Sequence, residues 1–107
     1  MFYRTDRNDH GLPHSPFKAI VAPRPIGWIS AMSRKGEINL SPYSYFNAVA
    51  DRPPVVLFSS DGMKDAASFA EETGEFVCNF VTYELREKMN LTSAPLPRGE
   101  SEMAFAG

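Results

Sequence analysis

The sequence predicts a mainly β domain with short helices, of the α+β class or the small-barrel class. Residues 26–32 and 37–40 are β-favouring segments on either side of a short turn that ends at Gly36. Residues 53–58 form a continuous apolar run of strand length, and residues 75–81 are expected to form a further strand. Two short helices are expected, at residues 65–72 and 83–91.

Length and composition limit the classes of protein that the chain can belong to. With 107 residues, residues 1–107 are expected to form one domain. The formal net charge of −2 and the absence of a basic stripe argue against nucleic-acid binding. The longest apolar run is far too short to span a bilayer, and charged residues interrupt any signal-peptide core. Cys78 is the single cysteine, so no internal disulfide is possible and we expect a reducing, cytoplasmic location.

The N-terminal quarter is expected to be an extended lead-in, residues 1–16, followed by a first strand at residues 17–22. His10 and His14 have a spacing that can bind metal on a helix, but the intervening Gly and Pro argue against a helix. Two solvated loop histidines are therefore the favoured interpretation, and no metal site is predicted. Arg24 lies between two prolines that give it an extended backbone, so its side chain either reaches an anion or stays solvated.

In the strand at residues 26–32, alternation places Trp28 and Ser30 on one face and Gly27 on the other. Trp28 is predicted to be core. The Ser30 hydroxyl is either satisfied locally or faces a ligand. Gly27 allows another backbone to approach closely. After the partner strand, residues 41–47 are predicted to be a polar loop in which small donors alternate with aromatic residues, a pattern that suits a planar ligand.

Residues 47–52 are expected to be a connection with a charged tip, and residues 53–58 a strand buried on both faces. The helix at residues 65–72 has Asp65 as its expected N-cap and Gly74 as its stop signal. Lys64 beside a helix N-terminus suits an anion, although the same residues also fit a capped surface helix. Cys78 is predicted to be a small buried hydrophobe.

Toward the C-terminus, Thr82 is the expected cap of the helix at residues 83–91, residues 92–99 are expected to be a loop, and residues 100–107 show no completed pattern. The predicted strands leave a sheet edge exposed. A missing segment or a second subunit is needed to cover that edge.

Four blocks in order carry a resemblance to a known family that covers almost the whole chain from Leu12 onward. They are APRPIGWIS (residues 22–30), NLSPYSYFN (39–47), DRPPVVLFS (51–59), and KDA with GEFVCN (64–66 and 74–79). In these blocks the chain resembles the flavin reductase-like, FMN-binding split-barrel proteins. That family includes flavoredoxin and the reductase components of two-component monooxygenases, such as nitrilotriacetate monooxygenase component B.

The resemblance implies a split β-barrel homodimer that binds FMN, or alternatively FAD, and takes hydride from NADH or NADPH. The implied function is an FMN-dependent NAD(P)H:flavin oxidoreductase, with a monooxygenase component as an implied partner. An FMN-binding electron carrier without reductase turnover and an inactive half-domain are the alternatives. No catalytic side chain is expected, because the redox chemistry belongs to the cofactor. The implied flavin-binding residues are Ser30, Ala31, Met32, Ser44, Asn47, Ala48, Val49, Ser59, Ser60, Lys64 and Asp65.

The chain departs from the family pattern in two ways. Chains of this family are considerably longer, so the chain is expected to hold the N-terminal portion of a single flavin reductase-like domain, with an incomplete barrel. Ala66 stands where a hydroxyl residue often follows Lys-Asp, which is expected to remove one hydrogen bond to the phosphate.

Overall fold

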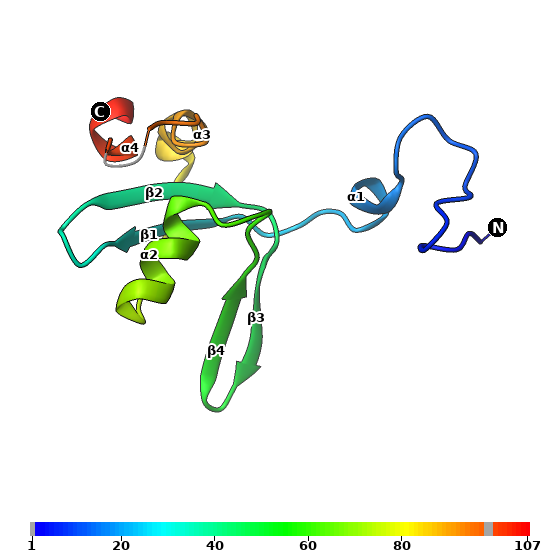
Figure 1. Cartoon of the computed structure of the whole chain (residues 1–107), viewed down its shortest axis with the longest axis horizontal. Helices are drawn as coiled ribbons and strands as arrows, with labels where there is room; N and C mark the ends of the chain where they lie inside the picture. The colour runs from blue at the N-terminus through cyan, green and yellow to red at the C-terminus, as the bar shows by residue number, and fades with distance from the viewer. Residues whose placement is uncertain (1, 98–99) are drawn as a thin grey trace.

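Figure 1 shows the computed structural model of the chain, which describes residues 2–97 and 100–107. The elements run in the order α1 (Phe17–Ile20), β1 (Gly27–Met32), β2 (Ile38–Tyr43), β3 (Phe46–Asp51), β4 (Pro54–Phe58), α2 (Asp65–Thr73), β5 (Val77–Asn79), the 3-10 turn η1 (Tyr83–Leu85), α3 (Arg86–Leu91) and α4 (Glu102–Ala106). None of the helices in the described residues is long and apolar enough to cross a membrane.

A three-stranded antiparallel sheet in the order β2-β1-β5 forms the body of the molecule. β1 and β2 are joined by the predicted hairpin, in which Gly36 has a φ of 85° and the Ser33 N–H donates to the Glu37 carbonyl at 2.8 Å. This φ lies in the region where glycine has no Cβ penalty, so the turn forms where the sequence places it. The prediction of this strand pair is confirmed.

The second sheet is the two-stranded hairpin β3-β4, which projects away from the body (Figure 1). Two predictions are wrong here. Residues 41–47 are not a loop, because β2 continues to Tyr43 and β3 begins at Phe46, and residues 47–52 form most of β3 rather than a connection. The barrel is therefore not closed, and the fold is mostly strands with short helices.

Strand β4 occurs where it was predicted, but its burial was predicted wrongly. Val55, Val56 and Leu57 are each more than a third exposed. The reason is that, within residues 2–97 and 100–107, β4 pairs only with β3 and no helix covers the hairpin (Figure 1). An apolar run predicts a strand from its own residues, whereas burial depends on neighbours that the run does not encode.

Helix α2 covers one face of the three-stranded sheet. Ala66 is fully buried in a cluster with Ile29 and Tyr43. Gly74 ends the helix as predicted, with φ 78° and its N–H bonded to the Ala70 carbonyl at 2.8 Å. The prediction of Asp65 as N-cap is wrong by one residue: Lys64 is the N-cap, without a side-chain cap bond, and Asp65 is the first helical residue.

The other face of the sheet packs against the C-terminal helices. Trp28 is 9% exposed, and its Nε1–H donates to the Thr92 Oγ1 at 2.9 Å, so its predicted place in the core is confirmed. Thr82 precedes η1 without a side-chain cap bond, and α3 follows η1 directly. Of the loop expected at residues 92–99, residues 98 and 99 lie outside the described part. Helix α4 was not predicted.

Two further predictions, the strand at residues 17–22 and the burial of Cys78, are wrong because no neighbouring element in the described part of the chain supports them. Residues 17–22 do not form a strand; Phe17–Ile20 are helix α1, which lies beyond the end of the three-stranded sheet and belongs to neither sheet (Figure 1). Cys78 is exposed rather than buried, because no element packs over that side of β5 in the described residues.

Candidate functional site

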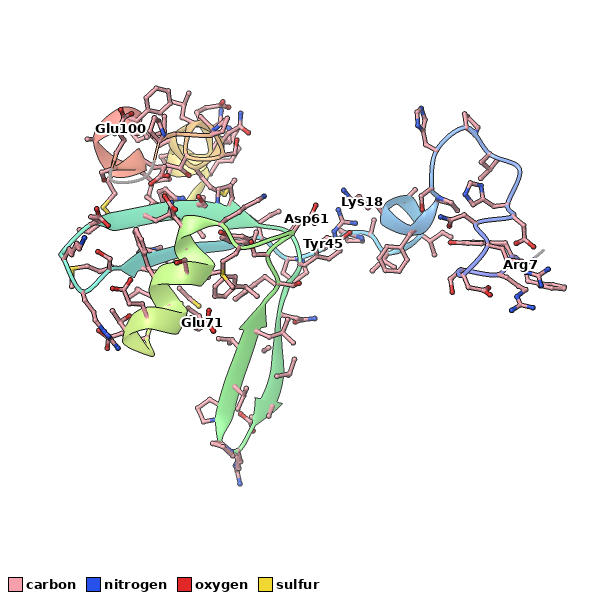
Figure 2. All side chains as sticks on the ribbon, in the orientation of Figure 1. Arg7, Lys18, Tyr45, Asp61, Glu71 and Glu100 are labelled. Atoms are coloured by element: carbon pink, nitrogen blue, oxygen red, sulfur yellow. The ribbon has the colours of Figure 1, made fainter. Side chains whose placement is uncertain are left out.

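A cavity of about 550 Å³, here called cavity 1, lies where β2, the start of α2 and the C-terminal segment meet. Lys18, Tyr45 and Asp61 all line the cavity. Figure 2 shows Tyr45 and Asp61 where the hairpin meets the three-stranded sheet, and Lys18 beside helix α1. Other lining residues are Asn39, Ser41, Tyr43, Ser44, Ser59, Lys64, Asp65, Ser93 and Glu102. The volume falls within the range of small-molecule and cofactor sites.

The start of α2 gives cavity 1 an end suited to an anion. The first intrahelical bond runs from the Ser68 N–H to the Lys64 carbonyl at 2.9 Å. The N–H groups of residues 65–67 therefore precede the helical ladder, and no side chain caps them. Lys64 and Lys18 add positive charge, while Asp61, Glu102 and Asp65, which is the first residue of α2 itself, add negative charge. The lining is mixed in charge, and an anion is favoured only at the helix end.

Tyr43 and Ser60 bring two hydroxyl groups to the region of cavity 1. Burial raises the pKa of the Tyr43 phenol above its ordinary value of 10.0, against a smaller lowering by the Ser60 hydroxyl, and the Glu102 and Asp65 carboxylates raise it further. The phenol is therefore neutral and can donate a hydrogen bond. Ser60 Oγ is buried and has no partner with full hydrogen-bond geometry among the described residues. The Ser60 hydroxyl interacts with the Tyr43 phenol without full hydrogen-bond geometry, so it can still bond to a ligand or water.

Glu102 is a cavity residue that the sequence did not indicate. Its side chain is 4% exposed and accepts hydrogen bonds from the Asn39 Nδ2 at 2.8 Å and from the Leu40 backbone N–H at 3.1 Å. It thereby fixes helix α4 against the outer edge of β2. The Asn39 Oδ1 is left without a partner among the described residues. The only sequence signal was the unpaired edge of β2, which indicates that some group covers it but not which one.

A second hollow of about 530 Å³, here called cavity 2, lies between the segment of residues 17–25 and the base of the β3-β4 hairpin. It shares Ser44, Tyr45 and Ser59 with cavity 1. The Ser59 N–H donates to the Tyr45 carbonyl at 2.8 Å, so these shared residues form one hydrogen-bonded wall. Its other lining residues are Phe17, Val21, Pro23, Arg24, Pro25, Phe46, Asn47 and Leu57.

The predicted site residues fall into two groups. The first lies at the cavities: Ser44 and Ser59 line both, Lys64 and Asp65 line cavity 1, and Asn47 lines cavity 2. Ser60 lines neither cavity but follows Ser59 directly, and its Oγ is buried.

The second group lines neither cavity in the single chain. It contains Ser30, Ala31 and Met32 on β1 and Ala48 and Val49 on β3. The Ser30 hydroxyl is satisfied locally, since it accepts a hydrogen bond from the Asn79 Nδ2 at 3.1 Å. A flavin-binding role of these residues stays a prediction.

Ala66 stands at the position where a hydroxyl residue was expected to hydrogen-bond the phosphate, but the structure places this position in the core. Its side chain is 0% exposed and packs against Ile29 and Tyr43. A hydroxyl at this Cβ would therefore lie in the hydrophobic cluster. In this chain the helix end offers its backbone N–H groups and Lys64 instead.

The open, antiparallel β structure, with one helix across the three-stranded sheet and two adjoining cavities, agrees with the incomplete barrel that the sequence predicted. The model of the flavin reductase-like domain family matches residues 21–107. The chain belongs to the flavin reductase-like family, as its sequence motifs predicted.

Relatives and solved structures agree with this family. An uncharacterised protein of Aquifex aeolicus (strain VF5) is 41% identical over 93 residues, which make up 82% of this chain and 47% of that protein. The crystal structure of nitrilotriacetate monooxygenase component B from Bacillus cereus superposes with a TM-score of 0.81 at 29% identity, over 99% of this chain and 55% of that one.

A protein with a split barrel domain from Shewanella frigidimarina NCIMB 400 has the same fold, with a TM-score of 0.78 at 20% identity over 98% of this chain and 55% of that one. The chain thus spans about half the length of the curated relative and of the solved structures described here.

Proposed function

We propose that the chain acts as an FMN-dependent NAD(P)H:flavin oxidoreductase that supplies reduced flavin to a monooxygenase component. The observation that carries the proposal is cavity 1, where an uncapped nine-residue helix and Lys64 meet serine hydroxyls in a hollow of cofactor size. Family membership and the similarity to a monooxygenase component B support it. The single cysteine, which permits no internal disulfide, supports a reducing, cytoplasmic location.

The residues around cavity 1 fit a flavin mononucleotide. When bound, the flavin supplies the hydride-accepting ring, and the chain binds and orients it. Lys64 and the free N–H groups of α2 would bind the phosphate. The Ser60 hydroxyl, whose Oγ is buried near the Tyr43 phenol, and the neutral phenol itself would hydrogen-bond the polar parts. Ser44 and Ser59 would contact the ligand from the wall that both cavities share.

The remaining predicted residues enter the proposal through a homodimer. Ser30, Ala31, Met32, Ala48 and Val49 line neither cavity of one chain, so we propose that they meet flavin only where two chains pair. The half-exposed Val49 and Met32 side chains support a covered surface in the assembly.

An absorbance titration tests the proposal. The purified full chain is titrated with FMN, FAD and riboflavin, and NADH or NADPH is then added under anaerobic conditions. We expect FMN to bind more tightly than riboflavin, because riboflavin lacks the phosphate for Lys64. We expect the flavin absorbance to bleach on addition of the nicotinamide nucleotide. A protein that binds none of the three flavins would contradict the proposal.

A second candidate is a flavin-binding protein without reductase turnover, or a half-domain that needs a further segment to become active. The observation that favours it is the open barrel, in which the hairpin and the three-stranded sheet remain separate. Tight FMN binding with no steady-state NAD(P)H oxidation would support the binding protein. Non-cooperative thermal unfolding of the flavin-free chain would support the half-domain.

A further inference from the structure

Cavity 2 differs from cavity 1 in its chemistry. Its walls are mainly apolar and aromatic, with Phe17 and Val21 on one side and Phe46 and Leu57 on the other. No lysine, aspartate or glutamate lines it, and Arg24 is its one charged lining residue among the described part of the chain. Such a hollow favours a ligand that is largely flat and apolar, with one group that complements a guanidinium.

Arg24 is held in a fixed position at this cavity. Its Nη1 donates to the Lys18 carbonyl at 2.8 Å and to the Val21 carbonyl at 2.7 Å. Its guanidinium carbon lies 5.3 Å from the centroid of the Tyr45 ring, within the range of a cation–π contact. The guanidinium is thus pre-organised, and little rotamer freedom remains to be lost when it binds a ligand.

Arg24 also lacks an anionic partner. Within residues 2–97 and 100–107 no carboxylate pairs with it, and its buried Nε has no hydrogen-bond acceptor. A half-buried guanidinium normally satisfies its donors, because an unpaired buried donor costs free energy. Nη1 uses both of its hydrogens for the Lys18 and Val21 carbonyls, and Nε is buried, so a carboxylate would accept from Nη2.

We propose that cavity 2 binds a small aromatic carboxylate, with the ring among the aromatic side chains and the carboxylate at Arg24. The inference rests on the proposed function only in that the adjoining cavity 1 is the proposed flavin site. Since Ser44, Tyr45 and Ser59 line both hollows, a ligand in cavity 2 would lie directly beside one in cavity 1.

The competing explanation is that Arg24 only caps the C-terminal carbonyls of α1. If Arg24 is only a structural cap, cavity 2 should have similar affinities for charged and neutral ring compounds. If Arg24 binds a carboxylate, the affinity for the charged compound should be higher. The ratio of the affinities for benzoate and for its neutral isostere benzamide is therefore the decisive measurement.

Calorimetric titrations of the full chain, with and without saturating FMN, use benzoate, benzamide and nicotinamide mononucleotide as probes. We expect benzoate to bind about tenfold more tightly than benzamide, or better, because a charge-assisted pair is stronger than a neutral hydrogen bond. In Arg24→Gln the ratio should fall to about one. Arg52→Gln is the matched control: Arg52 also precedes a proline, but its side chain is 95% exposed on the hairpin tip and lines neither cavity.

A second variant keeps Arg24 and its backbone bonds in place. Val21→Trp should fill part of cavity 2 and lower the affinities for benzoate and benzamide by a similar factor. The affinity for FMN should stay unchanged, because Val21 does not line cavity 1. The inference is overturned if the wild-type chain shows no preference for benzoate, if Arg24→Gln keeps the preference, or if nicotinamide mononucleotide binds in place of benzoate. A chain that binds benzoate but no flavin would refute the proposed function and leave the carboxylate site standing.

Discussion

At the scale of single residues, Gly27 determines how closely the two sheets approach. A Cβ at this position would lie 2.5 Å from Cγ and Cδ2 of the Phe46 ring. The sequence indicated a close approach at Gly27 but assigned it to a backbone. The structure shows that an aromatic side chain from β3 fills the space, which could not be predicted because β3 itself was not.

Gly27→Ala is expected to destabilise the fold by about 1–3 kcal/mol, because the added methyl overlaps the Phe46 ring. Urea unfolding followed by Trp28 fluorescence measures the change. In the Phe46→Ala background the same substitution should cost less, since alanine lacks the Cγ and Cδ2 atoms that the methyl would overlap. Equal costs in both backgrounds would show that the contact does not limit position 27.

Tyr43 is expected to make stability fall at alkaline pH. Burial raises the pKa of its phenol above 10.0 in the folded chain. Below pH 10 both states hold the proton and no dependence arises; above it the unfolded state loses the proton first, so stability declines as pH rises toward the folded pKa. Unfolding free energies measured from pH 8 to 11 should show this decline. Tyr43→Phe should reduce it, and Tyr83→Phe, at a side chain that is 74% exposed, should not.

At the scale of elements, the sequence predicted those that depend on their own residues. The β1-β2 hairpin follows from its turn, and the C-terminal end of α2 follows from Gly74. The sequence did not predict the elements that depend on contacts with distant parts of the chain. Strand β3 exists because β4 pairs with it, and α4 is fixed to β2 by Glu102. The same division holds for the site: the anion-suited start of α2 was predicted from a local pattern, whereas cavity 2 requires residues 17–25 to lie beside a distant hairpin.

Helix α2 is expected to contribute phosphate binding through Lys64. Lys64→Gln should lower the affinity for FMN about tenfold. The affinity for riboflavin, which lacks the phosphate, should stay nearly unchanged. Fluorescence titration of both flavins measures the ratio. Lys88→Gln is the control, because Lys88 lies on α3 and lines neither cavity. An equal loss for FMN and riboflavin would place the phosphate elsewhere.

Helix α4 is expected to depend on the buried carboxylate of Glu102. Glu102→Ala leaves the Asn39 amide and the Leu40 N–H without their acceptor, at a cost of roughly 1–3 kcal/mol for each unsatisfied buried group. Glu102→Gln keeps one acceptor oxygen and should cost less. Amide hydrogen exchange at Leu40 measures the effect directly; unchanged protection in the alanine variant would mean that α4 does not protect this edge.

At the scale of the whole molecule, the single chain is more extended than a compact domain. Its radius of gyration is 16.2 Å. A compact domain of this length is expected to have about 13 Å. The projecting hairpin and the N-terminal segment account for the difference (Figure 1). Along the hairpin Val49, Val55 and Leu57 are each at least two-fifths exposed, so an apolar surface is left that folding of one chain does not bury.

We expect two chains to pair over this hairpin, because an exposed apolar surface of this kind favours association. Sedimentation velocity of the full chain should show a dimer. Val55→Lys should raise its dissociation constant about a hundredfold or more, since burying an unpaired charge costs several kcal/mol. Asn90→Lys adds the same charge at an exposed position on α3 and should leave the dimer intact. A wild-type chain that sediments as a monomer at every concentration would contradict the homodimer part of the proposal. The residues of β1 and β3 that line neither cavity would then not reach a shared flavin site. Flavin titration would still test cavity 1 in the single chain.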